Sequence, residues 1–323
     1  MGRLDVSSGP QSTEALRRER LGLVFAALCA LDGAFSASLS KLSTNLADAA
    51  FVAAVVTLFG AVCSTAHLGF RGELGLLVRR DLAPGLIAIG LLGTAVAFLL
   101  FFEGSQRSSG IEIALCIQTE PLYALVLAWI ALGQRPTLTR IAASLAILVG
   151  IAIAVGIEQA SGSAGVWMLL ATPIAWQLSH LIALRGLRGV NPRVLTAARY
   201  VYGSAFLVAL WLLRGGLERF PPADVWPKLL PLLALHGIVL AWGGTLLWYN
   251  AITRLDLPRT TSIVVPSILI LSFGATFLVL GEVPSQREWL GLAITALGVL
   301  TFVRSSDAPE PSRSSTVLAR DAA

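Results

Sequence analysis

The stretch IALCIQTEPLYALVLAW, Ile113–Trp129, is apolar almost throughout, yet Glu120 and Pro121 stand side by side in its middle. The whole chain has the same character. Its 323 residues are 55% hydrophobic and only 13% charged, and the mean hydropathy is +0.76. A soluble protein needs charged residues nearer a quarter of its sequence. Lipid must therefore cover the sides of this protein, which we predict to be an all-α polytopic membrane protein.

Segments of about 20 mostly apolar residues are long enough to cross a bilayer as helices. The periodicity is not alternating and the segments are too long for barrel strands, so helices are the expected spanning element. We predict ten transmembrane helices, which run approximately over Arg20–Leu42, Ala47–Phe70, Leu82–Glu103, Ser108–Leu132, Leu138–Ile157, Ala164–Leu187, Arg193–Leu213, Lys228–Thr253, Arg259–Leu280 and Arg287–Val303.

The basic residues set the expected orientation. With the N-terminus inside, most of the 24 Lys and Arg residues fall in cytoplasmic segments, as the positive-inside rule requires. The same sorting explains the net charge of +5 without nucleic acid as a partner. We predict a multi-pass protein of the bacterial cytoplasmic (inner) membrane with both termini cytoplasmic. The predicted outside set is Lys41, Arg107, Arg214, Arg219, Lys228 and Arg287.

The sequence repeats itself. ALGQRPTLTRIAASLAILVGI, from Ala131, matches VLGEVPSQREWLGLAITALGV, from Val279, with glycines and prolines at constant spacing. Upstream of these segments each half carries a proline, Pro121 and Pro266. Because five spans are an odd number, the second half must be inverted relative to the first, an arrangement typical of transporters. We divide the chain into a cytoplasmic tail (1–19), two inverted five-helix repeats (20–158 and 163–304) and a disordered cytoplasmic tail (305–323).

These segments resemble a known family. TEPLYALVLAWIALGQRPTLTRIAASLAILVGI, from Thr119, and VPSILILSFGATFLVLGEVPSQREWLGLAITALGVL, from Val265, are similar to EamA-type members of the drug/metabolite transporter superfamily. The resemblance covers about Arg20 to Arg304. It implies two inverted five-helix halves and a central cavity lined by the first four helices of each half. One departure is Gln134, which stands where the family's first-half turn has Glu, while Glu282 keeps it in the second half.

Two carboxylates lie at the expected middle of the membrane. Glu120 is about 12 residues from each end of its span, or about 18 Å of helix rise, and Asp32 lies at a similar depth. A charge there costs at least about 2.5 kcal/mol, so it faces protein or trapped water. Since low dielectric favours the protonated carboxyl, Glu120 and, second, Asp32 are candidates for proton coupling. The alternative is a protonated residue that only bonds a neighbouring helix.

The Glu-Pro pair also predicts a local polar notch. Pro121 cannot donate to the carbonyl of Ile117, and its ring pushes that carbonyl aside. We expect a kink with a free backbone acceptor facing the cavity.

Other polar residues inside the spans are candidates for the substrate cavity. Arg199 either extends its charged end to the lipid headgroups, which is called snorkelling, or is a counter-ion for a carboxylate or an anionic solute. His180 and His236 either relay protons or are structural. Trp176 with Gln177, and Trp242, lie near mid-depth, where an aromatic wall with a polar handle suits a cavity. With Pro121 and Pro266 they complete the candidate set; Tyr200 is expected in the interfacial belt.

The predicted function is secondary active transport by alternating access, with export of a small metabolite or an amino acid and proton coupling as the specific hypothesis. Two rival classes are a lipid-head-group flippase and a non-transporting membrane sensor or scaffold. No catalytic constellation, cofactor motif or Cys/His metal spacing is present in the sequence, so we do not predict an enzyme. The small residues at positions 142, 146, 150 and 154 form a packing face, either within the chain or in a homodimer.

Overall fold

The computed structural model describes residues 10–133, 135–156, 163–255 and 257–306. In these residues the regular structure is helical, and ten stretches are long and apolar enough to cross a bilayer. The prediction of an all-α protein with ten membrane-spanning helices is confirmed. The stretches are Leu16–Leu46, Ala49–Phe70, Ala83–Arg107, Gly110–Ala131, Leu138–Val155, Ala164–Gly186, Pro192–Leu213, Ala223–Leu255, Ile263–Leu280 and Gln286–Ser305.

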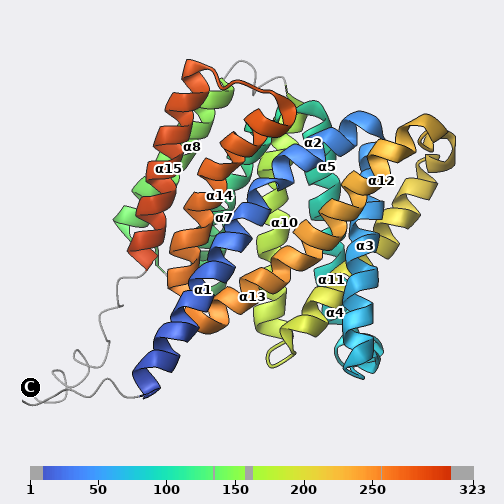
Figure 1. Ribbon diagram of the computed structural model, residues 1–323, viewed down its shortest axis with the longest axis horizontal. Coiled ribbons are helices and arrows are strands. Elements are labelled where there is room, and N and C mark those ends of the chain that lie inside the picture. Colours follow the sequence, from blue (N-terminus) through green and yellow to red (C-terminus); the bar gives the residue numbers. More distant parts are fainter. Residues whose placement is uncertain (1–9, 134, 157–162, 256, 307–323) are drawn as a thin grey trace, which may run out of the picture.

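Among the described residues, six spans are single helices and four are interrupted; Figure 1 shows how they are arranged. The single helices are α3 (Ala49–Phe70), α8 (Leu138–Val155), α10 (Ala164–Gly186), α11 (Pro192–Leu213), α14 (Leu257–Leu280) and α15 (Gln286–Ser306). The interrupted spans are the first, α1 (Pro10–Ala34) and α2 (Ser36–Leu46); the third, α4 (Ala83–Gly90), η2 (Leu91–Val96) and α5 (Ala97–Arg107); the fourth, α6 (Gly110–Cys116), η3 (Ile117–Thr119) and α7 (Glu120–Leu132); and the eighth, α12 (Trp226–Ala234), η6 (Leu235–Gly243) and α13 (Gly244–Leu255).

The first span differs from its predicted limits at both ends. Helix α1 begins at Pro10, ahead of the predicted Arg20, because a helix can continue into water beyond the bilayer where its charged residues are solvated. It breaks at Phe35, whose N–H donates to the carbonyl of Asp32, 3.2 Å away, and α2 then extends the span to Leu46. Of the predicted tails, residues 1–9 and 307–323 lie outside the described residues, as does Gln134.

Helix ends follow the local sequence. Asp48 starts α3 by accepting hydrogen bonds from the N–H groups of Ala50 and Phe51, which leaves fewer unsatisfied donors at the helix start. Ser109 and Glu112 form a reciprocal capping box on α6. The turn glycines that match between the two halves, Gly133 and Gly281, have φ of 69° and 70°, a left-handed conformation that suits glycine after a helix end.

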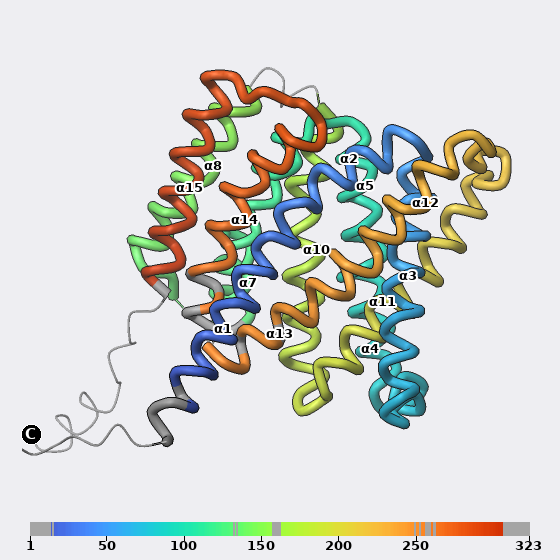
Figure 2. The backbone as a smooth tube through the Cα atoms, viewed as in Figure 1, coloured from blue at the N-terminus to red at the C-terminus, as the bar shows by residue number. Residues whose placement is uncertain are grey.

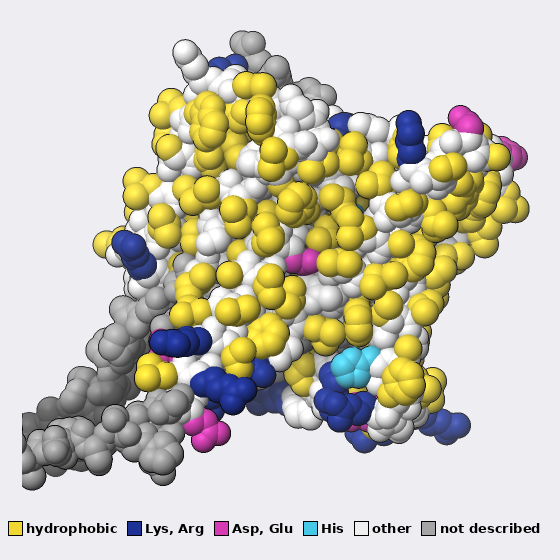
Figure 3. All heavy atoms as spheres, viewed as in Figure 1, with side chains coloured by type: hydrophobic (Ala, Val, Ile, Leu, Met, Phe, Trp, Pro, Cys, Tyr) yellow, Lys and Arg dark blue, Asp and Glu magenta, His cyan; other side chains and the backbone are white. Residues whose placement is uncertain are grey.

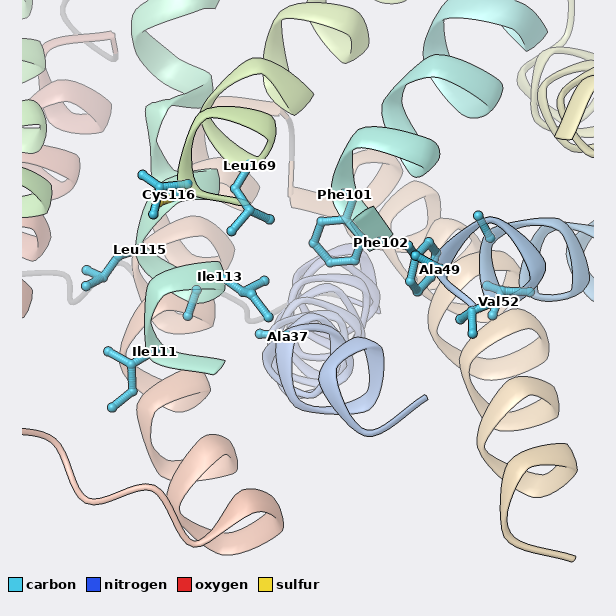
Figure 4. Packing of buried hydrophobic residues seen from close by; sticks show 14 of the residues in the cluster. Ala37, Ala49, Val52, Phe101, Phe102, Ile111, Ile113, Leu115, Cys116 and Leu169 are labelled. Carbon is cyan, nitrogen blue, oxygen red and sulfur yellow. The ribbon is translucent and has the colours of Figure 1, made fainter. Parts of the chain in front are cut away.

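The core of the bundle is built from large apolar side chains packed against small ones. Phe101 and Phe102 of α5 lie between labelled residues of α6 and α10 on one side and of α3 on the other, with Ala37 of α2 below them (Figure 4). Phe102 is fully buried, as are Ile113 and Leu169. Most side chains on the visible outer face are hydrophobic, whereas Lys and Arg gather along its lower edge (Figure 3). This distribution suits a protein whose sides face lipid.

Helices α8 and α15 pack antiparallel at one side of the bundle (Figure 2). Arg140 near the start of α8 donates to the carbonyl of Ser305 at the end of α15, and Arg287 near the start of α15 donates to that of Ile153 at the end of α8. The backbones approach closely at Gly150, where an added Cβ would lie 2.7 Å from the carbonyl oxygen of Gly291. Gly150 therefore packs within the chain.

The third and eighth spans each contain a stretch of wide, π-helical turns, η2 and η6. Helix α11 packs against η2, and α3 packs against η6. Glycines allow both contacts: a Cβ on Gly203 would lie 3.0 Å from the carbonyl oxygen of Gly90, and one on Gly237 would lie 2.5 Å from that of Val56. Because π turns occur often at functional sites, these two segments direct attention to the middle of the bundle.

Candidate functional site

Glu120 is the first residue of α7 and follows a short 3-10 turn, Ile117–Thr119. This turn replaces the predicted kink with its free acceptor: the N–H of Glu120 donates to the carbonyl of Ile117. The expectation of an unpaired Ile117 carbonyl was wrong, because the tighter turn pairs it one residue earlier than an α-helix would. The turn still separates α6 from α7 and places the carboxyl group at the break.

The carboxyl group of Glu120 meets the second half of the chain. Its Oε1 accepts a hydrogen bond of 2.9 Å from Nε2 of Gln177 on α10. Glu120 is half-buried in the bundle. The contact joins the fourth span to the sixth span, and it brings two predicted site residues together.

Arg199 is a third polar residue inside the bundle. Its Nη2 donates a hydrogen bond of 2.9 Å to the carbonyl of Gly93 in η2. The side chain therefore points into the bundle and does not snorkel to the headgroups. The wide turn at Gly93 supplies the backbone acceptor of this inward-facing arginine, and its role as a counter-ion stays a prediction.

Asp32 forms a second polar position, on α1. Its Oδ2 lies so close to Gly244 that a Cβ there would be 2.3 Å away. Its Oδ1 is buried and has no hydrogen-bond partner among the described residues. Asp32 thus packs on the first turn after η6, whereas Arg199 packs on η2 itself.

The two tryptophans do not share one environment. Trp176 on α10 packs against Phe101, with ring centroids 6.4 Å apart, next to the Glu120–Gln177 contact. Trp242 packs edge-on against His67, at 6.3 Å, and lines a separate pocket with residues of α3 and α11. The pocket that Trp242 lines does not include Trp176, and the assignment of both rings to the substrate cavity stays a prediction.

The histidines and prolines also occupy different settings. His180 is exposed on α10, whereas His236 is 3% exposed and packs on Phe102 at a centroid distance of 5.3 Å. Pro266 is buried inside α14, which continues through it without a break. None of these three contacts Glu120 in the described part of the chain.

One residue of the polar interior was missed by sequence reasoning. Tyr200 is 8% exposed, so it lies inside the bundle and not in the interfacial belt. Its ring packs on Gly60 of α3. The signal was its position seven residues after Arg193 and next to Arg199, on a face of α11 that carries polar side chains. No group of three or more His, Cys, Asp or Glu side chains within the described residues could hold a metal ion.

Ten apolar spans around polar side chains define a multi-pass helical membrane protein with a polar interior. The model of the EamA-like transporter family matches residues 20–156 and 163–304. The chain belongs to the EamA-like transporter family, and small-molecule solutes and membrane lipid are the partners that this membership implies.

Similar proteins agree with this family. A "Probable terminal-alkyne amino-acid exporter" of Streptantibioticus cattleyicolor is 27% identical over 264 residues, which cover 78% of this chain and 86% of the relative. An "Uncharacterized transporter" of Archaeoglobus fulgidus is 22% identical, over 68% of this chain and 78% of its own length. A solved crystal structure with 19% identity and a TM-score of 0.59 covers 90% of this chain and 99% of that one. That likeness concerns the fold alone.

Proposed function

We propose that this protein is a secondary active transporter that exports a small metabolite or an amino acid by alternating access, coupled to protons through Glu120. The observation that carries the proposal is the hydrogen bond between Glu120 and Gln177. It connects the two family-matched parts of the chain at the depth where a solute must change sides. A carboxyl group there can bind a proton from one side and release it to the other.

Reciprocal packing supports the alternating-access mechanism. Helix α11 packs on the third span and α3 on the eighth, and Arg140 and Arg287 make matching contacts between α8 and α15. This is the pattern expected if the two halves are inverted copies, as the sequence repeat predicts. In such an arrangement, exchanging the conformations of the halves exchanges the side to which the site opens.

An amino acid is the solute class that fits best. Glu120 and Arg199 carry opposite charges that suit an ammonium and a carboxylate, and the Trp176–Phe101 ring pair offers an apolar surface within the bundle. The name of the Streptantibioticus relative points to the same class and to export. Asp32 is the second proton-binding candidate, because it packs on the other π-containing span.

The orientation is part of the proposal. The end of the bundle where α3 ends and α11 begins, here called the basic end, faces the cytoplasm by the positive-inside rule. Helix α1 begins and α15 ends toward this end (Figure 1), so both termini are cytoplasmic. The basic end carries Arg71, Arg79, Arg80, Arg185, Arg188, Arg193 and Arg254.

Proteoliposomes loaded with radiolabelled leucine and other amino acids test the coupling. The wild type should release the solute faster when a pH gradient is applied, and Glu120→Gln, which keeps the shape but not the titration, should lose this acceleration. Glu218→Gln, at an exposed position outside the spans, is the matched control and should behave as wild type. An unchanged pH dependence in Glu120→Gln would falsify proton coupling through this residue.

A further inference from the structure

The short helix α2 carries a polar sequence that the proposed function does not use. The stretch SASLSKLST, Ser36–Thr44, places five hydroxyl groups and one ammonium group at the end of the first span. Because α2 ends just before α3 begins, it lies opposite to the basic end, at the outer end in the proposed orientation (Figure 1). Four of the hydroxyl-bearing residues are at most 2% exposed: Ser38, Ser40, Ser43 and Thr44.

Lys41 attaches α2 to the end of α5. Its Nζ donates hydrogen bonds to the backbone carbonyls of Ser105 and Gln106, at 3.3 and 3.1 Å. Both carbonyls belong to the last turn of α5, where a helix leaves acceptors without partners and attracts a positive charge. The contact is reciprocal, because Nε2 of Gln106 donates to the carbonyl of Thr44, at 3.1 Å. The hydroxyl of Ser40 also donates to that of Ser105, at 3.2 Å.

A break separates this polar helix from α1. Phe35 stands between the two helices, and its N–H donates to the carbonyl of Asp32, three residues back instead of four. No side chain caps α2 at this point. Helix α1 is held near the basic end, where Arg18 donates to the carbonyl of Thr253 on α13, at 2.8 Å. A rotation at Phe35 would therefore move α2 and leave α1 in place.

The contact between α2 and α5 is of a kind that water can replace. Separating apolar side chains exposes surface that water does not stabilise. Hydroxyl and ammonium groups instead exchange protein partners for water with a small net change in free energy. The hydroxyl of Ser43 is buried without a hydrogen-bond partner among the described residues, so a hydrated state would satisfy it. These properties favour a contact that opens over one that only holds the bundle together.

We propose that α2 is the outer gate of the transporter and that Lys41 holds it closed on the end of α5. The inference rests on the proposed transport function and orientation, and it adds the segment that opens toward the outside. When α2 turns away at Phe35, water replaces the α5 carbonyls as the partner of the Lys41 ammonium. A solute inside the bundle then has access to the outer side.

Labelling of a buried thiol tests the role of Lys41. Ser43→Cys introduces the thiol at a fully buried position, and a membrane-impermeant maleimide is applied from outside to the full-length protein in its membrane. Labelling should be slow with Lys41 present and at least about tenfold faster with Lys41→Met, a factor that corresponds to about 1.4 kcal/mol. Lys228→Met is the matched control, because Lys228 is exposed at the start of α12, at the same end. Lys41→Met without the new thiol gives the background from the native cysteines.

A reversible cross-link separates gating from misfolding. The hydroxyl oxygens of Ser40 and Ser105 are 3.2 Å apart, so Ser40→Cys combined with Ser105→Cys should form a disulfide on oxidation. The oxidised protein should lose leucine efflux from proteoliposomes, and reduction should restore it, which a misfolded protein does not do. Ser40→Cys alone, treated in the same way, is the control.

Three results would each overturn the outer gate: equal labelling with Lys41 and with Lys41→Met, failure of the cysteine pair to oxidise, or unchanged efflux by the oxidised pair. Absence of leucine efflux in the wild type would contradict the proposed function instead. The labelling measurement needs no transport, so it decides whether Lys41 holds α2 closed in that case as well.

Discussion

The fourth and ninth spans both carry a proline in their middle, but only the fourth is interrupted. Helix α14 continues from Leu257 to Leu280 through Pro266, whereas α6 and α7 are separated by the 3-10 turn before Glu120. The residue ahead of the proline is Val265 in one case and Glu120 in the other. Proline alone removes one hydrogen bond and does not end a helix that is well packed. Of these two spans, only the one whose proline follows a carboxyl-bearing residue is interrupted.

Polar side chains close to the break explain how it is tolerated. Thr119 donates from its hydroxyl to the carbonyl of Cys116, at 2.8 Å, and Gln118 donates to that of Ala114, at 3.4 Å. Backbone acceptors released by the irregular turns thus find partners, as they must in a medium without water. The stretch ahead of Pro266, with Val264 and Val265, offers no such donors, so a continuous helix is its better solution.

The largest expected effect comes from making the fourth span resemble the ninth. Glu120→Val removes a carboxylate whose position near the bilayer centre costs about 2.5–3.5 kcal/mol on insertion scales. Gln177 loses its partner, at a cost of about 1 kcal/mol. We expect thermal stability in detergent to be equal or higher while pH-dependent transport falls at least about tenfold, which is the factor given by about 1.4 kcal/mol.

Thermal unfolding and proteoliposome flux on the same preparation check this pair of outcomes. Loss of both stability and transport would mean that Glu120 stabilises the bundle and would contradict its proposed role in proton coupling. Retained pH-dependent flux would mean that the residue ahead of the proline has no role in proton coupling in either span.

A smaller effect should distinguish the two π segments. Gly237→Ala places a methyl group 2.5 Å from the carbonyl oxygen of Val56, a backbone atom, whereas Gly93→Ala meets the side chain of Ser179. Because a side chain can move aside and a helix backbone cannot do so easily, Gly237→Ala should cost more, about 1–3 kcal/mol. Gly274→Ala in α14 is the control, because nothing lies within 4 Å of its Cβ position. Alanine there should raise the free energy of unfolding by about 0.5–1 kcal/mol.

Chemical or thermal unfolding of the three variants in one detergent gives the ranking. A Gly93 variant less stable than the Gly237 variant would reverse the comparison and point to Arg199, which lies 3.1 Å from the added Cβ of Gly93, as the stronger constraint.

The smallest effect concerns the turn residue that differs between the halves. Glu282 accepts hydrogen bonds from the N–H groups of Gly110 and Ile111 at the start of α6, so it caps a helix of the other half. Glu282→Ala should lower the free energy of unfolding by about 1 kcal/mol, the usual value for a lost helix cap. Glu282→Gln keeps one acceptor and should lose less. Equal stability of both variants and the wild type, measured by thermal unfolding, would show that the cap contributes nothing.

Much of the fold was predictable because lipid imposes simple rules on sequence. Span length and apolarity gave the ten helices, and the rarity of mid-membrane charge selected Glu120, which the structure places beside Gln177. Hydropathy carries no information on helix type, so η2, η6 and the turn at Ile117 were not foreseen. They depend on close glycine contacts between distant segments, such as Gly237 with Val56. The roles of the candidate site residues stay predictions.

The close contact of α8 with α15 has a practical consequence. Where Gly150 meets the backbone of Gly291, no side chain can adapt to sliding, so this pair should remain fixed while the other spans rearrange. It is therefore the place to attach a rigid fusion partner or a reference fluorophore, against which displacements elsewhere during a transport cycle can be measured.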